Sequence, residues 1–332
     1  MSDVQAFYRG ADYPPWVVGM SAASAWTWAP ALILSTDIAA NRGLLGAAAF
    51  VVPNILALWL FALVGRRVSP FALFRSGPVR GLYHAGYGAV EFFCLLIQVT
   101  AGANVAAMFF GVGYRLAACA FLGGSLALSL RGGLHASIRA NVIQQSVLIA
   151  ASVVLLAAAP GGPRWPVPMG VFSWRDAAVY SAILFSGPIM THQHWQRADR
   201  AGYFLGGAFF AVPLAALSAV GLFSGTTGDY ISMSIFAGAP AARWVLAAAL
   251  LSGLLSTTQS ALASVIGIFG GPETIAAGRW KMAALSGAAM AAVMFNFPIL
   301  SLWKTMGAFR VAMAAGVIYV LAAGRDRLSA AL

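Results

Sequence analysis

The sequence predicts an all-α, multi-pass membrane protein whose ten membrane-spanning helices form two inverted halves of five. Of its 332 residues, 61% are hydrophobic and only 9% are charged, whereas soluble domains carry about 25% charged residues. The chain also contains ten mostly apolar segments, each close to the roughly 20 residues that a bilayer core requires. Strand-like alternation is absent, which disfavours an outer-membrane barrel. The sequence is therefore typical of a helical membrane protein.

The ten apolar segments give the expected helices in chain order. They lie at residues 15–36, 43–64, 86–110, 114–130, 135–158, 175–196, 203–224, 241–269, 280–296 and 298–323. The first has no basic n-region and no small-residue cleavage site before it, so we expect it to stay in the protein as a membrane helix.

The division into two halves follows from the number of helices. Five is odd, so the second set of five enters the membrane from the opposite side to the first, which is the topology of an inverted repeat. We expect one transmembrane domain with residues 1–162 as the first repeat and 163–332 as the second. The spacing agrees, because Trp26 in the first segment and Gly187 in the sixth are about 160 positions apart.

The basic residues predict the orientation. The net charge of +11 comes from short clusters between apolar segments rather than from a basic tail or stripe, so topology explains it better than nucleic-acid binding does. Cytoplasmic loops are enriched in Lys and Arg. With the N-terminus inside, the cytoplasmic side holds Arg9, Arg66, Arg67, Arg75, Arg80, Arg131, Arg139, Arg197, Arg200, Arg279, Lys281, Arg325 and Arg327, and the opposite side only Arg42, Arg115, Arg164, Arg175 and Arg243. We expect the protein to lie in a bacterial inner membrane, with both termini in the cytoplasm.

The first helix of each half contains residues that favour a break. The first segment has polar residues at mid-depth followed by Pro30, and the sixth contains Gly187, Pro188 and Thr191. Proline cannot donate its amide and glycine relaxes the backbone. In transporters with inverted repeats, such broken helices supply carbonyls and helix ends to ions and substrate. The alternative is that these residues only kink the helices.

The eighth segment carries a run of hydroxyl side chains in an otherwise apolar span, formed by Ser256, Thr257, Thr258 and Ser260. Hard monovalent cations prefer oxygen ligands, so this run is a candidate sodium site. Hydroxyls inside membranes also bond back to helix carbonyls or across to neighbouring helices, which is the alternative.

One acidic residue, Glu91, lies well inside a predicted span. Charges inside a membrane are costly and count as functional candidates by default. Glu91 could attract a cationic solute, carry a proton, or pair with Arg310 in the tenth segment.

Several stretches in order resemble the sodium/solute symporter family, the group that contains proline, pantothenate and sodium/glucose transporters. Ser24-Ala25-Trp26-Thr27 is similar to the family's Ser-Ala-Trp-Thr or Ser-Gly-Trp element, and residues 131–144 to its Gly-Gly-Leu stretch. Residues 193–198 resemble its Trp-Gln-Arg motif, and Ser256-Thr257-x-x-Ser260 matches its Ser-Thr-x-x-Ser signature. The matches span residues 19–270.

The resemblance implies a LeuT-type fold with a sodium ion between the first and eighth helices. Its ligands would be the hydroxyls of Ser256 and Thr257 and the main-chain carbonyls of Met20, Ala23 and Gly253. Two departures matter. We expect the chain to be the ten-helix core alone, either a minimal transporter or a fragment. Asn141 stands where the family usually has Asp, which removes a negative charge and could weaken or alter ion coupling.

The solute is expected near mid-membrane between the first, third, sixth and eighth helices. Candidate residues are Ser24, Trp26, Thr27, Gln98, Ser186, Thr191 and Gln193, although Trp26 could equally face lipid or the core. The sequence thus predicts sodium-coupled symport of a small polar organic solute by alternating access, with no cofactor besides the co-transported sodium ion. A proton-coupled or uncoupled transporter of the same fold, or a transporter-derived sensor or assembly module, is the alternative. An enzyme is disfavoured because the nine acidic residues lie nearly all in loops.

Overall fold

The computed structural model describes residues 3–9, 12–64, 78–159, 168–171, 173–228, 231–268 and 273–329. Its helices are α1 (Asp3–Arg9), α2 (Pro15–Trp26), α3 (Ala29–Val64), α5 (Pro78–Phe110), α6 (Tyr114–Ala157), α7 (Trp174–Met190), α8 (His192–Trp195), α9 (Arg200–Ser224), α10 (Ile231–Phe236), α11 (Pro240–Ile268), α12 (Ile275–Val293) and α13 (Ile299–Ser329). Arg66, Arg67, Arg75 and Arg164, which contribute to the predicted orientation, lie outside the described residues.

The described part of the chain contains twelve helices rather than ten, because some predicted segments are split and others are merged. The first segment is divided between α2 and the start of α3, and the sixth between α7 and α8. The second segment continues α3, while α6 holds both the fourth and the fifth. The short helices α1 and α10 lie outside the predicted segments. The number of membrane crossings therefore stays a prediction.

Two glycines explain why consecutive predicted segments appear as one helix. Gly43 in α3 has φ 68° and ψ −166°, and Gly133 in α6 has φ 54° and ψ −134°, so each of these helices consists of two helical segments joined at a kink. Positive φ costs little for glycine because it has no Cβ. A Cβ at Gly133 would also meet the carbonyl oxygen of Phe7, so α1 packs directly on this turn.

Within the described part of the chain, five helices are long and apolar enough to cross a membrane, at 31–64, 81–110, 114–157, 200–224 and 240–268. Helix α2 has only 12 residues, about 18 Å at 1.5 Å per residue, too short to span a bilayer alone. This short length is expected of a helix that is interrupted partway through the membrane. The chain is a multi-pass membrane protein.

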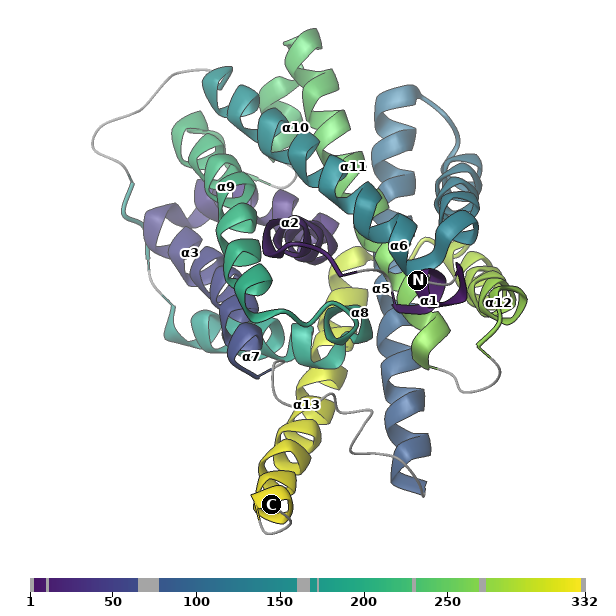
Figure 1. Cartoon of the computed structure of the whole chain (residues 1–332). Coiled ribbons are helices and arrows are strands. Elements are labelled where there is room, and N and C mark those ends of the chain that lie inside the picture. The colour runs from purple at the N-terminus through teal and green to yellow at the C-terminus, as the bar shows by residue number, and fades with distance from the viewer. Residues whose placement is uncertain are drawn as a thin grey trace.

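The helices pack in two groups that each combine the two halves of the chain. Helices α2 and α3 pack with α7 and α9, and α5 and α6 pack with α11 and α12. Helix α13 contacts both α7 and α5. In Figure 1, α2 lies near the middle of the molecule, between α3 and α9 on one side and α5 and α6 on the other.

Helix α2 has the environment of a core element. Every residue from Gly19 to Trp26 is buried, and a helix that is buried on all sides must be covered by neighbours around its whole circumference. Those neighbours are chiefly α9, α6 and α11. Polar side chains on α2 are therefore forced to find partners on other helices.

Candidate functional site

Both predicted helix breaks are present, each a few residues from its proline. Helix α2 ends at Trp26, and Thr27 (φ −76°, ψ 77°) leaves the helical conformation before α3 begins at Ala29. Thr191 is extended (φ −114°, ψ 111°) between α7 and α8. Pro188 is accommodated inside α7 rather than ending it. The breaks free backbone carbonyls in the protein interior.

Helix α11 meets the first break through Thr257. The Thr257 hydroxyl donates to the carbonyl oxygen of Thr27 (2.8 Å) and to that of Gly253 (3.2 Å), and the Thr27 hydroxyl donates to the carbonyl of Ala23 (2.8 Å). Three of the predicted sodium ligands, Ala23, Gly253 and Thr257, are thus brought together around Thr27. Met20 is buried one turn before Ser24 on α2.

A second set of contacts joins α2, α6 and α11, and we call it the polar cluster. Its members are Ser21, Ser24, Ser137, Asn141, Ser256 and Ser260, all buried. Ser256 Oγ lies 2.5 Å from Ser24 Oγ and donates to Asn141 Oδ1 (3.0 Å). Asn141 Nδ2 donates to Ser260 Oγ (2.9 Å) and, more weakly, to Ser21 Oγ (3.3 Å). The cluster therefore concentrates neutral oxygen atoms beside the first break.

The guanidinium group of Arg197 lies against this cluster. Its side chain is only 5% exposed, and Nη2 donates to Ser137 Oγ and Ser260 Oγ, both at 3.2 Å. Its Nε and Nη1 atoms have no hydrogen-bond partner among the described residues. Arg197 lies in the connection between α8 and α9, outside the predicted spans, but its side chain is buried. A fixed positive charge lies one hydroxyl group away from Asn141.

A cavity of about 360 Å³ reaches the polar cluster from the side of the chain where Asp12 and Asp199 lie. Ser21 and Arg197 both line it. Because this cavity is large enough for water molecules, the polar cluster can exchange ions and water with one side of the protein. This side includes the start of α2 and the α8–α9 connection.

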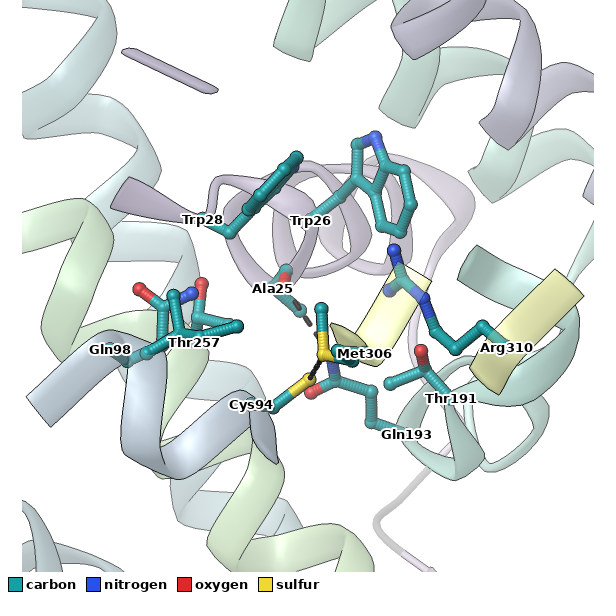
Figure 2. Close-up of a pocket in the computed structure, with 11 residues that line it drawn as sticks. Ala25, Trp26, Trp28, Cys94, Gln98, Thr191, Gln193, Thr257, Met306 and Arg310 are labelled. Carbon is teal, nitrogen blue, oxygen red and sulfur yellow. Dashed lines mark hydrogen bonds between the residues drawn. The ribbon is translucent and has the colours of Figure 1, made fainter. Parts of the chain in front are cut away.

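A smaller cavity of about 20 Å³ lies between the two breaks, with room for about one water molecule. Figure 2 shows its walls. Eleven residues line it: Ala25, Trp26, Trp28, Cys94, Ile97, Gln98, Thr191, Gln193, Thr257, Met306 and Arg310. Thr257 thus borders this cavity and also contacts the first break.

Four of the seven predicted solute residues line the small cavity: Trp26, Gln98, Thr191 and Gln193. The other three do not. Ser24 belongs to the polar cluster, Thr27 bonds back to Ala23, and the Ser186 hydroxyl donates to the carbonyl of Ile183 (2.9 Å) within α7.

Glu91 and Arg310, suggested as a charge pair, are buried but have separate partners. Glu91 Oε1 accepts from the backbone N–H of His192 (3.1 Å), at the start of α8. Arg310 Nη2 donates to the carbonyl of Ile183 (3.4 Å). The two side chains are not within ion-pair distance.

Several cavity residues were not predicted from the sequence, namely Ala25, Trp28, Cys94, Ile97 and Met306. A periodic signal existed for α5, because Glu91, Cys94 and Gln98 are spaced three and four apart and share one helix face. Met306 and Arg310 share a face of α13 in the same way. Trp28 could not be placed, since its direction depends on where the helix breaks.

Comparison with known proteins identifies the fold. No protein-family model matches the chain, and no characterised protein sequence matches it significantly. Among solved structures, a Na⁺-coupled sialic acid symporter in a substrate-bound outward-open state is similar, with a TM-score of 0.74, 13% identity, and coverage of 95% of this chain and 80% of that one. Mhp1, a nucleobase-cation-symport-1 family transporter with bromovinylhydantoin bound, is similar with a TM-score of 0.65 and 13% identity. The match covers 94% of this chain and 78% of that one.

A manganese transporter mutant of Eremococcus coleocola is also similar, with a TM-score of 0.59, 12% identity, and coverage of 96% of this chain and 78% of that one. These proteins are LeuT-fold transporters. At such low identity the likeness establishes the fold, and this chain has the LeuT fold.

Proposed function

We propose that the protein is a secondary transporter that moves a small polar organic solute together with sodium by alternating access. Sodium would lie between α2 and α11, held by the hydroxyls of Ser256 and Thr257 and the carbonyls of Met20, Ala23 and Gly253. The solute would occupy the small cavity between the two breaks. The transporter fold supports this proposal, as does the sodium-coupled symporter among its structural neighbours.

The single observation that carries the proposal is the position of Thr257. Its hydroxyl contacts the broken end of α2 and its side chain also borders the small cavity. An ion bound to Thr257 would replace hydrogen bonds between α11 and α2 with ion–oxygen contacts, and would thereby fix one wall of the solute site. Coupling requires that each ligand strengthen the binding of the other. A shared residue provides a direct physical route.

The wider architecture that we propose follows from the sequence. Residues 1–162 and 163–332 form the two inverted repeats, with ten membrane crossings in all and both termini in the cytoplasm of a bacterial inner membrane. The group of α2, α3, α7 and α9 moves against the group of α5, α6, α11 and α12, so the cavity opens to each side in turn. Membership of the sodium/solute symporter family is part of this proposal.

Arg197 favours a second candidate, transport by the same fold without sodium. Its guanidinium group donates to Ser260 in the polar cluster, and Asn141 leaves that cluster without a negative charge. A resident positive charge repels an incoming cation. If this repulsion prevents sodium from binding, the protein is a proton-coupled or uncoupled transporter instead of a sodium symporter.

The melting temperature of the detergent-purified protein tests the proposal, measured with sodium and with potassium at equal ionic strength. A ligand that binds only the folded state stabilises it by about 2.7 kcal/mol at about 100 times its Kd. We expect sodium to raise the melting temperature of the wild type by several degrees, and Ser256→Ala to abolish this response. Ser125→Ala removes a buried hydroxyl that only bonds back to Phe121 on α6, and should retain the response.

Equal melting temperatures in sodium and potassium would reject sodium coupling in favour of the second candidate. A sodium response that survives in Ser256→Ala would place the ion elsewhere.

A further inference from the structure

Arg310 brings a positive charge into the small cavity. It lies on α13, its side chain is 4% exposed, and it lines the cavity together with residues of α2, α5, α8 and α11. Figure 2 shows its guanidinium group directed toward Trp26, above Thr191. A Cβ added to Gly187 would lie 3.4 Å from Nη1, so the group also lies against α7 beside the second break.

The described residues give this charge few direct partners. Guanidinium has five N–H donors, yet the hydrogen bond that Arg310 makes to the described residues is a long one, from Nη2 to the carbonyl of Ile183 (3.4 Å). Its Nε has no partner there. No carboxylate of the described residues lies within ion-pair distance, and Glu91 directs Oε1 to the backbone of His192. An unpaired buried charge is strongly unfavourable, so such a site attracts an anion.

Two more orphaned polar atoms belong to residues of the same cavity. Gln193 Oε1 and Trp28 Nε1 have no hydrogen-bond partner among the described residues, although both side chains are more than nine-tenths buried. The Trp28 ring stacks on Trp303 with centroids 5.2 Å apart. Much of the remaining lining, including Ile97 and Met306, is apolar. The cavity thus combines a cation, a hydrogen-bond acceptor, a second donor and flat apolar surface.

We infer that the transported solute is an organic carboxylate whose anionic group binds the guanidinium of Arg310. This inference rests on the proposed transport function and names the chemical class of its cargo. A carboxylate accepts two parallel hydrogen bonds from guanidinium in a matching geometry, and an N–H or O–H group on the solute would donate to Gln193. Because the present cavity holds about one water molecule, the solute enters when the group of α2, α3, α7 and α9 moves away from the group of α5, α6, α11 and α12.

The test uses four acids with their primary amides, which have nearly the same shape without the charge: acetate, lactate, benzoate and nicotinate. Melting temperatures are measured in sodium for the wild type, Arg310→Lys, Arg310→Gln and the control Arg115→Gln, which removes an exposed charge on α6. We expect at least one acid to stabilise the wild type and the control while its amide does not. Arg310→Gln should weaken binding of that acid by about tenfold or more, and Arg310→Lys by less.

The melting temperature of each variant without solute shows whether the variant is folded. If the Arg310 charge awaits an anion from the cargo, Arg310→Gln should keep or raise the melting temperature of the ligand-free protein, because an uncompensated buried charge is removed. A clear loss of stability would mean that Arg310 has a packing role, and would overturn the inference. Amides that bind as well as acids, no response to any acid, or equal stabilisation by chloride would overturn it too.

The two proposals fail in different ways. Sodium stabilisation without a preference for acids would keep the sodium site and reject the carboxylate. Acid binding that is unaffected by sodium and by Ser256→Ala would keep the anion site and reject sodium coupling.

Discussion

Changing Asn141 to Asp is expected to raise the apparent affinity for sodium by about tenfold, or about 1.4 kcal/mol. Asn141 lies at the centre of the polar cluster, where it accepts from Ser256 and donates to Ser260. A carboxylate there would add a full negative charge beside the proposed sodium ligands, worth about 4 kcal/mol at 4 Å and an effective dielectric constant of about 20. Arg197 also contacts Ser260, and its attraction for the same carboxylate offsets part of this gain.

The measurement is a sodium titration of the melting temperature. Gln145→Glu is the matched control, because Gln145 is buried one turn further along α6 and bonds Phe209 on α9 instead of the cluster. A carboxylate at that position should leave sodium affinity near the wild-type value. An unchanged or lower affinity in Asn141→Asp would show that the new carboxylate pairs with Arg197 and that the cluster does not hold the cation.

Changing Gly187 to Ala is expected to reduce transport by about a hundredfold while the protein still folds, which corresponds to about 2.7 kcal/mol. A Cβ on Gly187 would overlap Cη2 of Trp26 and lie 2.7 Å from Cζ3 of the same ring. The ring cannot easily move, because it is 4% exposed and its Nε1 donates to the carbonyl of Asn54 (3.2 Å). Extra atoms in a tightly packed site typically cost about 1–3 kcal/mol. The added methyl group therefore displaces a cavity wall.

Two companion variants make this result interpretable. Gly124→Ala on α6 has open space around the new methyl group, and its transport should be unchanged. A smaller ring should relieve the clash, so Trp26→Phe in the Gly187→Ala background should recover part of the activity. Full activity in Gly187→Ala alone would mean that the contact between the two breaks is not part of the transport machinery.

The sequence predicted the helices and their interruptions because both depend on local chemistry. Apolar segments marked the helical regions, and clustered polar residues, Gly187 and Pro188 marked the breaks. Their exact positions were not predictable. Pro188 is tolerated inside α7, where one missing N–H donor is a local loss, while Thr191 leaves the helix. The kinks at Gly43 and Gly133 likewise depend on packing with distant residues.

The family motif predicted the contact between α11 and α2, and four of the seven predicted solute residues line the cavity. The motif did not predict that the side chains of Arg197 and Arg310 are buried beside these sites. A long side chain near a helix end normally reaches toward water, so Arg197 was counted as a loop charge, yet it turns inward to Ser137 and Ser260. For Arg310, one suggestion from the sequence was a pair with Glu91, the only acidic residue well inside a predicted span, but Glu91 accepts from the backbone N–H of His192 in α8.

The most direct test of the central claim is solute uptake by the purified protein in proteoliposomes. A pooled mixture of small organic acids is applied with and without an inward sodium gradient, and the acids that accumulate inside are identified and quantified. Uptake is measured instead of current, because one sodium ion that moves with one monovalent carboxylate carries no net charge. Sodium symport predicts accumulation that requires the sodium gradient, disappears in Ser256→Ala and persists in Ser125→Ala. Uptake that is identical with and without sodium, or that is unaffected by the Ser256 substitution, would contradict sodium-coupled transport at this site.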